Sequence, residues 1–336
     1  MITEREVRVW ADEQGLANLA LAEQDCRLVR TLETIYADAF LAPRLGIKGG
    51  TALNKLYLKR TPRLSVDLDF NHLGSKQEVL RERREICERL TKLLQAQDPS
   101  YNVGCKRRYE QTTLTVKYRA VTGVRAHLKV EVSHVERFPI LEGLTLRLEA
   151  PDTSFKVTSY KLEELVATKL RALFERLKGR DVYDLYYAAQ LRQDWVAVRK
   201  LFLYYFYRSR KVFNPKVYFK NISEKYQAGR YVDDVSAFIR PDSSFVLSKA
   251  IDKILIHYSF LGGLDERDQR FLALARYLLG GQVAHAALPA VQRIKLPLKD
   301  LFGTKKISDE AASITISDIK PYSKRKKPPR TPTRKI

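Results

Sequence analysis

The sequence has few cysteines and no long apolar run. The first argues against a zinc site and the second against a membrane-spanning segment. Its three cysteines are widely spaced, with no CxxC pair or Cys/His cluster. This usage argues against a zinc site and favours a reducing compartment. No apolar stretch approaches the roughly 20 residues of a membrane span. The first residues mix acidic and basic side chains, so we expect no signal peptide, no membrane contact and a cytoplasmic location.

Two common nucleotide-binding motifs are also missing. The stretch GIKGGTAL lacks the GxxxxGK[ST] spacing of a P-loop, and no GxGxxG follows a predicted strand. The five histidines are scattered along the chain. Their spacing argues against a histidine-based metal site and against a Ser/His triad.

Positive charge, by contrast, is in large excess. The chain holds 61 Lys+Arg against 39 Asp+Glu, a formal net charge of +22. The last residues, from Pro321 onward, contain seven of these cations and no acid, which leaves +15 for residues 1–320. Such an excess favours binding to phosphate backbones, so the predicted partner is nucleic acid. A membrane surface is less favoured, because no basic amphipathic helix stands out.

Length and periodicity predict two domains. The 336 residues are 45% hydrophobic, enough for a substantial core. Helical spacing covers residues 11–41 and 78–95, whereas strict alternation predicts strands at RLSVDLDF, TTLTVKY and HLKVEVS. We therefore expect an α+β domain with a mixed or antiparallel sheet over residues 1–155. A mainly helical domain is expected over residues 156–302, and a flexible polar and basic tail over residues 303–336.

The stretch GIKGGTALNKLYLKRTPRLSVDLDF carries the predicted chemistry. Gly49 and Gly50 precede a short predicted helix that begins at or just after Thr51. Glycine lets the backbone approach a phosphate closely. The following strand places Asp67 and Asp69 on one face, about 7 Å apart, where a divalent cation would offset their repulsion. Taken separately, the glycines could form a plain turn and the aspartates a solvated strand face. Together they predict a triphosphate and metal site, with Lys48 beside the glycines as a further nucleotide contact.

Two further residues extend this predicted site. Glu131, in the strand LKVEVS, is the candidate for a third metal ligand. A surface-facing strand glutamate explains it equally well. Ser65 lies on the same strand face as Asp67 and is predicted to line the triphosphate site, although a small strand residue needs no such role.

The stretch from Leu45 to Phe70 resembles the first two motifs of the AbiEii/MenT-like nucleotidyltransferase toxins, which belong to type IV toxin–antitoxin systems. Lys169 in ATKLRAL is similar to the third motif of that family, and Asp181 and Asp184 in RDVYDLY are similar to the fourth. The resemblance thus extends to Tyr187. It implies a minimal, polymerase-β-like nucleotidyltransferase fold, an NTP as substrate, Mg²⁺ or Mn²⁺ as cofactor, and a cognate antitoxin as partner.

The resemblance also implies roles for the later motifs. It makes Lys169 a catalytic group that counters triphosphate charge, Asp184 a catalytic residue and Asp181 a nucleotide-positioning residue. Periodicity alone leaves alternatives open. Lys169 lies within the apolar stripe of its helix, where a lysine can snorkel to solvent, and the two aspartates share a helical face that could be solvated.

These observations predict a metal-dependent transferase that moves a nucleotide from an NTP to an acceptor hydroxyl. The positive charge favours RNA as the acceptor, in particular the 3′ end of tRNA, and the result would be a block of translation and growth. One alternative is modification of a protein hydroxyl. Another, of a different class, is a non-catalytic RNA-binding module.

Two basic stretches are candidate RNA contacts. In Leu203–Lys220, Tyr207 or Tyr218 could stack on a base while the interleaved cations follow the backbone. Core packing explains the same rings. The second stretch is Lys106–Arg108, which could equally be a solvated turn.

Overall fold

A seven-stranded mixed sheet forms the centre of the protein, in the order β3-β4-β5-β2-β1-β7-β6. The computed structural model describes residues 2–59, 64–65, 67–229, 234–235, 239, 244–280 and 297–319. Strand β2 pairs in parallel with β5, and β1 with β7, while the other neighbours are antiparallel. The predicted α+β fold with a mixed sheet is therefore confirmed. The strands are β1 (Leu45–Lys48), β2 (Asp67–His72), β3 (Asn102–Arg107), β4 (Gln111–Arg119), β5 (Arg125–Ser133), β6 (Leu144–Ala150) and β7 (Thr153–Ser159).

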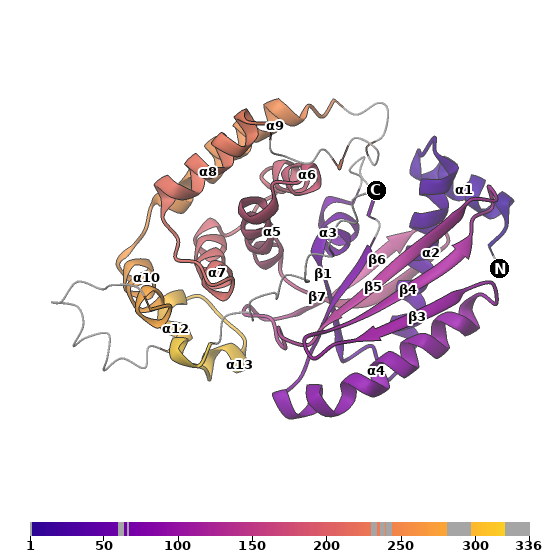
Figure 1. The fold of residues 1–336 in the computed structure, drawn as a ribbon, viewed down its shortest axis with the longest axis horizontal. Helices are drawn as coiled ribbons and strands as arrows, with labels where there is room; N and C mark the ends of the chain where they lie inside the picture. The colour runs from indigo at the N-terminus through magenta and orange to yellow at the C-terminus, as the bar shows by residue number, and fades with distance from the viewer. Residues whose placement is uncertain are drawn as a thin grey trace, which may run out of the picture.

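Three long helices accompany the sheet: α1 (Glu4–Gln14), α2 (Leu19–Ala37) and α4 (Lys76–Gln97) (Figure 1). The single helix predicted over residues 11–41 is divided, because Gly15 adopts a left-handed φ of 61° and ends α1. Asn18 then caps α2, since its side-chain oxygen accepts hydrogen bonds from two backbone N–H groups of the first turn.

Buried side chains occur at alternate positions of strands β4 and β5, so one face of these strands belongs to the core. Leu114 and Val116 of β4, and Val130 and Val132 of β5, are fully buried. Helix α4 contacts β3 and β4, and helix α2 contacts β5. The neighbouring residues in each strand point to the other face, which carries mostly polar and charged side chains. The catalytic candidates of β2 lie on that second face.

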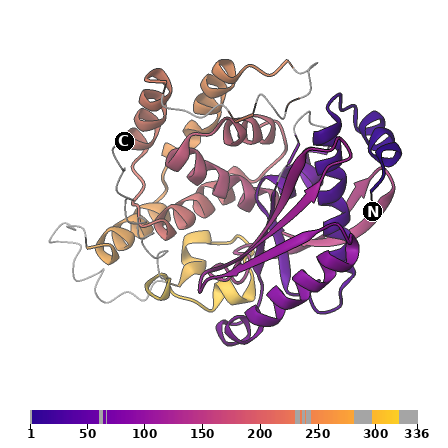
Figure 2. The same cartoon turned by 45° about the vertical axis from the view of Figure 1, so that its right-hand side comes forward.

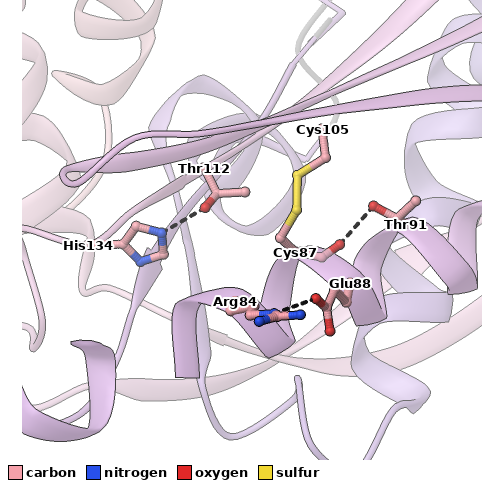
Figure 3. Close-up of a disulfide and its surroundings, with 7 residues drawn as sticks. All are labelled: Arg84, Cys87, Glu88, Thr91, Cys105, Thr112 and His134. Atoms are coloured by element: carbon pink, nitrogen blue, oxygen red, sulfur yellow. Dashed lines mark hydrogen bonds and ion pairs between the residues drawn. A yellow bond between two sulfur atoms is a disulfide. The ribbon is translucent and has the colours of Figure 1, made fainter. Parts of the chain in front are cut away.

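A disulfide joins Cys87 of α4 to Cys105 of β3 (Figure 3). The sequence favoured a reducing compartment and predicted no pairing, so the expectation of reduced thiols is corrected for this pair. Cys26 is free and buried. The pairing depends on α4 lying against β3, and cysteine spacing along the chain does not reveal that packing.

The second half of the described chain is mainly helical, and Figure 1 shows its helices gathered beside the sheet, away from α1 and α4. The predicted boundary after residue 155 falls inside β7, because that strand continues to Ser159 and pairs with β1. None of the described helices combines the length and apolar character that a membrane crossing requires. The helices are α5 (Leu162–Arg176), α6 (Gly179–Ala188), α7 (Trp195–Arg208), α8 (Pro215–Gln227), α9 (Leu247–His257), η3 (Tyr258–Gly262) and α10 (Glu266–Leu278).

Part of the sequence assigned to the flexible tail is packed in the structure. Helix α12 (Leu298–Phe302) ends where the predicted tail begins, and residues 303–319 of that tail form α13 (Asp309–Ala312) and η5 (Ile316–Asp318). Figure 2 shows this segment in yellow beside the sheet and the helical half. The backbone N–H of Ser308 donates to the carbonyl of Ile140 at 2.9 Å. The remainder of the predicted tail, residues 320–336, lies outside the described residues.

A truncation tests the structural role of this segment. We expect a chain that ends at Phe302 to unfold more easily, because it loses the buried side chains of Ala311, Ile316 and Ile319. Each buried isoleucine contributes about 1.5–3 kcal/mol, so the free energy of unfolding should fall by about 3–6 kcal/mol. Urea denaturation measures this change. A chain that ends at residue 319 is the control, and equal stability of the two truncations would contradict the prediction.

Candidate active site

Asp67, Asp69 and Glu131 lie on one face of the sheet, in the neighbouring strands β2 and β5. Asp67 and Asp69 alternate along β2, so they point to the same side, and Asp69 is the register partner of Glu131 in β5. Glu131 forms an ion pair with Lys129 of its own strand. Burial raises the pKa of the Asp69 carboxyl, and Glu131 and Asp67 raise it further against the opposing charge of Lys48. The structure thus places the three residues that the sequence proposed as metal ligands on the same face of two paired strands.

A close backbone approach positions Asp69. Strand β1 ends at Lys48, and Gly49 then turns the chain into α3 (Gly49–Ala52) with φ of +74°. A Cβ on residue 49 would lie 2.5 Å from Oδ2 of Asp69. No side chain fits that space, so the turn requires glycine for its conformation and for its contact.

The rest of the glycine turn is held against the same strand. The hydroxyl of Thr51 donates a hydrogen bond to the backbone carbonyl of Asp67. After Ala52 the chain continues as a π-helix, η1 (Leu53–Leu58). The residues predicted to hold phosphates, Lys48 to Thr51, therefore lie directly beside the predicted metal ligands.

Lys169 and two aspartates form a buried ion cluster next to this turn. Nζ of Lys169 lies 3.1 Å from Oδ1 of Asp181 and 2.7 Å from Oδ2 of Asp184. Both aspartates are fully buried, which excludes the solvated-face alternative. Burial alone raises the pKa of Asp181, but the charges of Lys169 and Arg176 outweigh it and hold this pKa well below its usual range. Lys169 is buried and paired, so it does not snorkel.

Asn54 connects the ion cluster to the glycine turn, and the sequence analysis missed it. Its amide Nδ2 donates to Oδ1 of Asp184 at 3.1 Å and to the carbonyl of Gly50 at 2.8 Å. Helix α5 packs against α3, and α6 packs against η1, as Figure 1 shows for α5 beside α3. The only signal in the sequence is the position of Asn54, one helical turn after Gly50.

Glu136 is a second residue that the sequence analysis missed. Its Oε2 lies 3.4 Å from Nζ of Lys48 and 3.3 Å from Nδ2 of Asn71. Burial raises the pKa of Glu136, but Lys48, Arg171 and Arg208 outweigh it and hold the pKa below its usual range. Lys48 therefore pairs with Glu136, and its charge also lowers the pKa of Asp69, its register partner in β2. Glu136 follows β5 in a stretch without periodicity, so no local pattern marked it.

The remaining predicted residues have mixed outcomes. Ser65 is buried, and its Oγ has no hydrogen-bond partner among the described residues. Its predicted place beside the triphosphate stays a prediction, because Val66 lies outside the described residues. Tyr207 and Tyr218 are buried, and the hydroxyl of Tyr218 donates to the carbonyl of Leu170. The suggestion that one of these rings stacks on a base is wrong, because both belong to the core.

The carboxylates fit a divalent cation that also binds a substrate phosphate. Mg²⁺ prefers oxygen ligands and is usually held by one or two carboxylates together with phosphates and water. Asp67 and Asp69 supply the two carboxylates on one face. A cation would offset the repulsion that the Glu131 and Asp67 carboxylates exert on the Asp69 carboxylate. Within the described residues no three acidic, histidine or cysteine side chains are arranged to enclose a metal by themselves, so Glu131 as a third ligand stays a prediction.

A glycine substitution tests the contact with Asp69. We expect Gly49→Ala to lower the free energy of unfolding by about 1–3 kcal/mol more than Gly280→Ala, the usual range for overpacking. Gly280 has a similar φ, +78°, but nothing lies within 4 Å of a Cβ there. The two variants share the backbone strain and differ in the clash. Urea unfolding compares them, and equal losses would show that Asp69 does not constrain the turn.

The comparisons with known proteins agree with this geometry. The model of the family described as "Nucleotidyl transferase AbiEii toxin, Type IV TA system" matches residues 30–262. This range contains the carboxylates, the glycine turn and the Lys169 cluster. No curated protein matches the chain.

Two solved structures are similar in fold. MenT4, a nucleotidyltransferase toxin from Mycobacterium tuberculosis, is 22% identical with a TM-score of 0.64, and the match covers 90% of this chain and 99% of MenT4. An antigenic nucleotidyltransferase-like protein from Paracoccidioides brasiliensis is 15% identical with a TM-score of 0.33, over 64% of this chain and 96% of that one. The family match covers most of the chain, so this protein belongs to the AbiEii family of nucleotidyltransferase toxins of type IV toxin–antitoxin systems.

Proposed function

We propose that this toxin transfers a nucleotide from an NTP to the 3′ hydroxyl of tRNA, in a reaction that depends on Mg²⁺ or Mn²⁺. The result would be a block of translation and growth, relieved by the cognate antitoxin that a toxin of this type has. One observation carries the proposal. The carboxylate of Asp69 lies directly against Gly49, and the backbone of Asp67 accepts a hydrogen bond from Thr51 of the same turn. Lys48 is the register partner of Asp69 and pairs with Glu136.

The cation would be held by Asp67 and Asp69, with Glu131 as a third ligand. When bound, it would neutralise phosphate charge and lower the pKa of the attacking hydroxyl. The backbone at Gly49 and Gly50 can approach phosphate oxygens because neither residue has a side chain. Thr51 holds this turn against β2 through its hydrogen bond to the carbonyl of Asp67.

Lys48 and Lys169 supply positive charge on two sides of the proposed phosphate position. Lys169 is held by Asp181 and Asp184, and Arg176 also pairs with Asp181, so two cations face two carboxylates in this cluster. Asn54 fixes the Asp184 carboxylate relative to Gly50. The two aspartates and Asn54 therefore act as positioning groups. We place Ser65 beside the triphosphate, where its buried hydroxyl could donate to a phosphate oxygen.

The charge of the protein supports an RNA acceptor. A net charge of +22 favours a polyanion over a typical protein surface, and tRNA and NTPs are both available in the cytoplasm, where we place the reaction. A protein hydroxyl as acceptor and a non-catalytic RNA-binding role are the alternatives that the assay must separate.

The test is incubation of the purified protein with total tRNA, Mg²⁺ and each labelled NTP in turn. We expect label from one NTP at the 3′ end of tRNA, and no label with Asp67→Asn/Asp69→Asn or with EDTA. Label in protein would move the acceptor class to protein. Bound RNA without any label would favour the non-catalytic module.

A matched pair of lysine variants separates catalysis from folding. Lys169→Met and Lys200→Met each remove a buried lysine from two aspartates, since Nζ of Lys200 lies 2.9 Å from Asp268 and 2.8 Å from Asp265. Breaking a buried pair costs about 3–5 kcal/mol, so we expect similar losses of stability in urea. Only Lys169→Met should lose nucleotide transfer, by about 100-fold or more.

Transfer by Lys169→Met at the rate of Lys200→Met, with both near the wild-type rate, would remove the proposed role of Lys169. Loss in both would show that the assay reports folding rather than phosphate binding. Transfer should therefore be measured on the fraction that remains folded at the assay temperature.

A further inference from the structure

The open face of strands β3, β4 and β5 continues directly from the carboxylates. The register places Lys106, Thr113, Glu131 and Asp69 in one row across the sheet, from the edge strand to β2. Further rows follow along β5 from Glu131 toward Arg125. They contain Lys129, then His127 opposite Lys117, then Arg125 opposite Arg119.

This face is uncovered in the described structure. Lys106, Lys117, Arg119, Arg125 and His127 are all exposed, while the alternate residues of β4 and β5 face the core. Cys105, next to Lys106, points to the other side and is joined to α4. In Figure 2 the strands lie at the front of the view with no helix drawn across them.

Apart from Glu131, the charged side chains of strands β3, β4 and β5 are all positive. Strands β3, β4 and β5 contain a single acidic residue, Glu131, at the end beside Asp69. We name the five cations that share this side of the sheet the basic strand face: Lys106, Lys117, Arg119, Arg125 and Lys129.

Most of these cations have no acidic partner. Within the part of the chain that the structure describes, no ion pair involves Lys106, Lys117, Arg119 or Arg125. On α4, by contrast, Arg84 pairs with Glu88 and Arg89 with Asp38. Arg119 and Arg125 stand directly opposite each other, and like charges in that position destabilise a strand pair. A bound polyanion relieves this repulsion.

The other basic stretch is a weaker site for a polyanion. Arg208 is buried, Lys211 pairs with Glu175 at 3.2 Å, and Lys220 lies 3.7 Å from Glu224. Its cations are thus partly neutralised, and its aromatic rings belong to the core.

We propose that the basic strand face binds the sugar–phosphate backbone of the RNA acceptor and leads its 3′ end to Asp67 and Asp69. This inference rests on the proposed function. From Glu131 to Arg125 the strand extends about 20 Å, at about 3.3 Å per residue, which spans several nucleotides of an RNA strand. The contacts are with phosphates, so the face selects RNA by charge and path rather than by base sequence.

The test compares Lys106→Gln/Lys117→Gln/Arg125→Gln with a control that removes three exposed cations from α4, Lys76→Gln/Arg81→Gln/Lys92→Gln. Both lose the same net charge, and only the first changes the basic strand face. The dissociation constant for tRNA is measured by fluorescence anisotropy between 50 and 200 mM KCl. We expect roughly tenfold weaker binding for the first variant and a salt slope smaller by about 2 to 3, since each phosphate contact contributes about 0.7 to 0.9.

Equal affinities and salt slopes for the two variants would overturn the inference. So would label transfer to a protein with unchanged tRNA binding, which would assign the face to an acidic protein partner. If the wild type binds tRNA with the expected difference between variants but transfers no nucleotide, the proposed function fails and the RNA-binding face stands. The single variant Lys117→Glu, checked by circular dichroism, replaces the triple variant if the latter does not fold.

Discussion

The contact between Gly49 and the carboxylate of Asp69 is the constraint on which the rest of the site depends. It fixes the end of β1 against the middle of β2, and through the Thr51 hydroxyl it fixes the start of α3 as well. Strands β1 and β2 are neighbours near the centre of the sheet, and Asp69 points to the side opposite the buried Leu68 and Phe70. The same side then holds Glu131 and the basic strand face.

Buried charges are paired with opposite charges in most of the protein, but like charges lie close together in the site. Buried cations elsewhere are neutralised in place, as with Arg27, whose guanidinium contacts Glu23 and Asp98, or Lys200 with Asp265 and Asp268. Around Asp69, like charges remain close together, and burial adds to their effect on its pKa. An unpaired excess of negative charge in the site and of positive charge on the strand face is unfavourable without ligands. The proposed divalent cation and the proposed RNA would remove these two costs.

Several parts of the fold could not be predicted from local pattern. Strand β1 has only four residues and includes Gly46, so it shows no usable alternation and lay hidden among turn signals. Strands β6 and β7 form a hairpin with Pro151 in its turn, and neither strand was predicted. Residues 303–319 looked polar, yet Ile316 and Ile319 reach the core. In each case pairing or burial against a distant segment overrides a weak local preference.

The sequence by itself determined the family and predicted the site. Gly49, Asp67 and Asp69 were proposed from residue type and spacing, and Lys169 from its resemblance to a family motif, because phosphate contact and metal binding require particular side chains. Only the tertiary structure decided which residues meet. It placed Asn54 against Asp184, Glu136 against Lys48, and Cys87 against Cys105. It also placed the basic strand face on the side of Asp69, because cross-strand register is a non-local property that depends on the packing of the whole sheet.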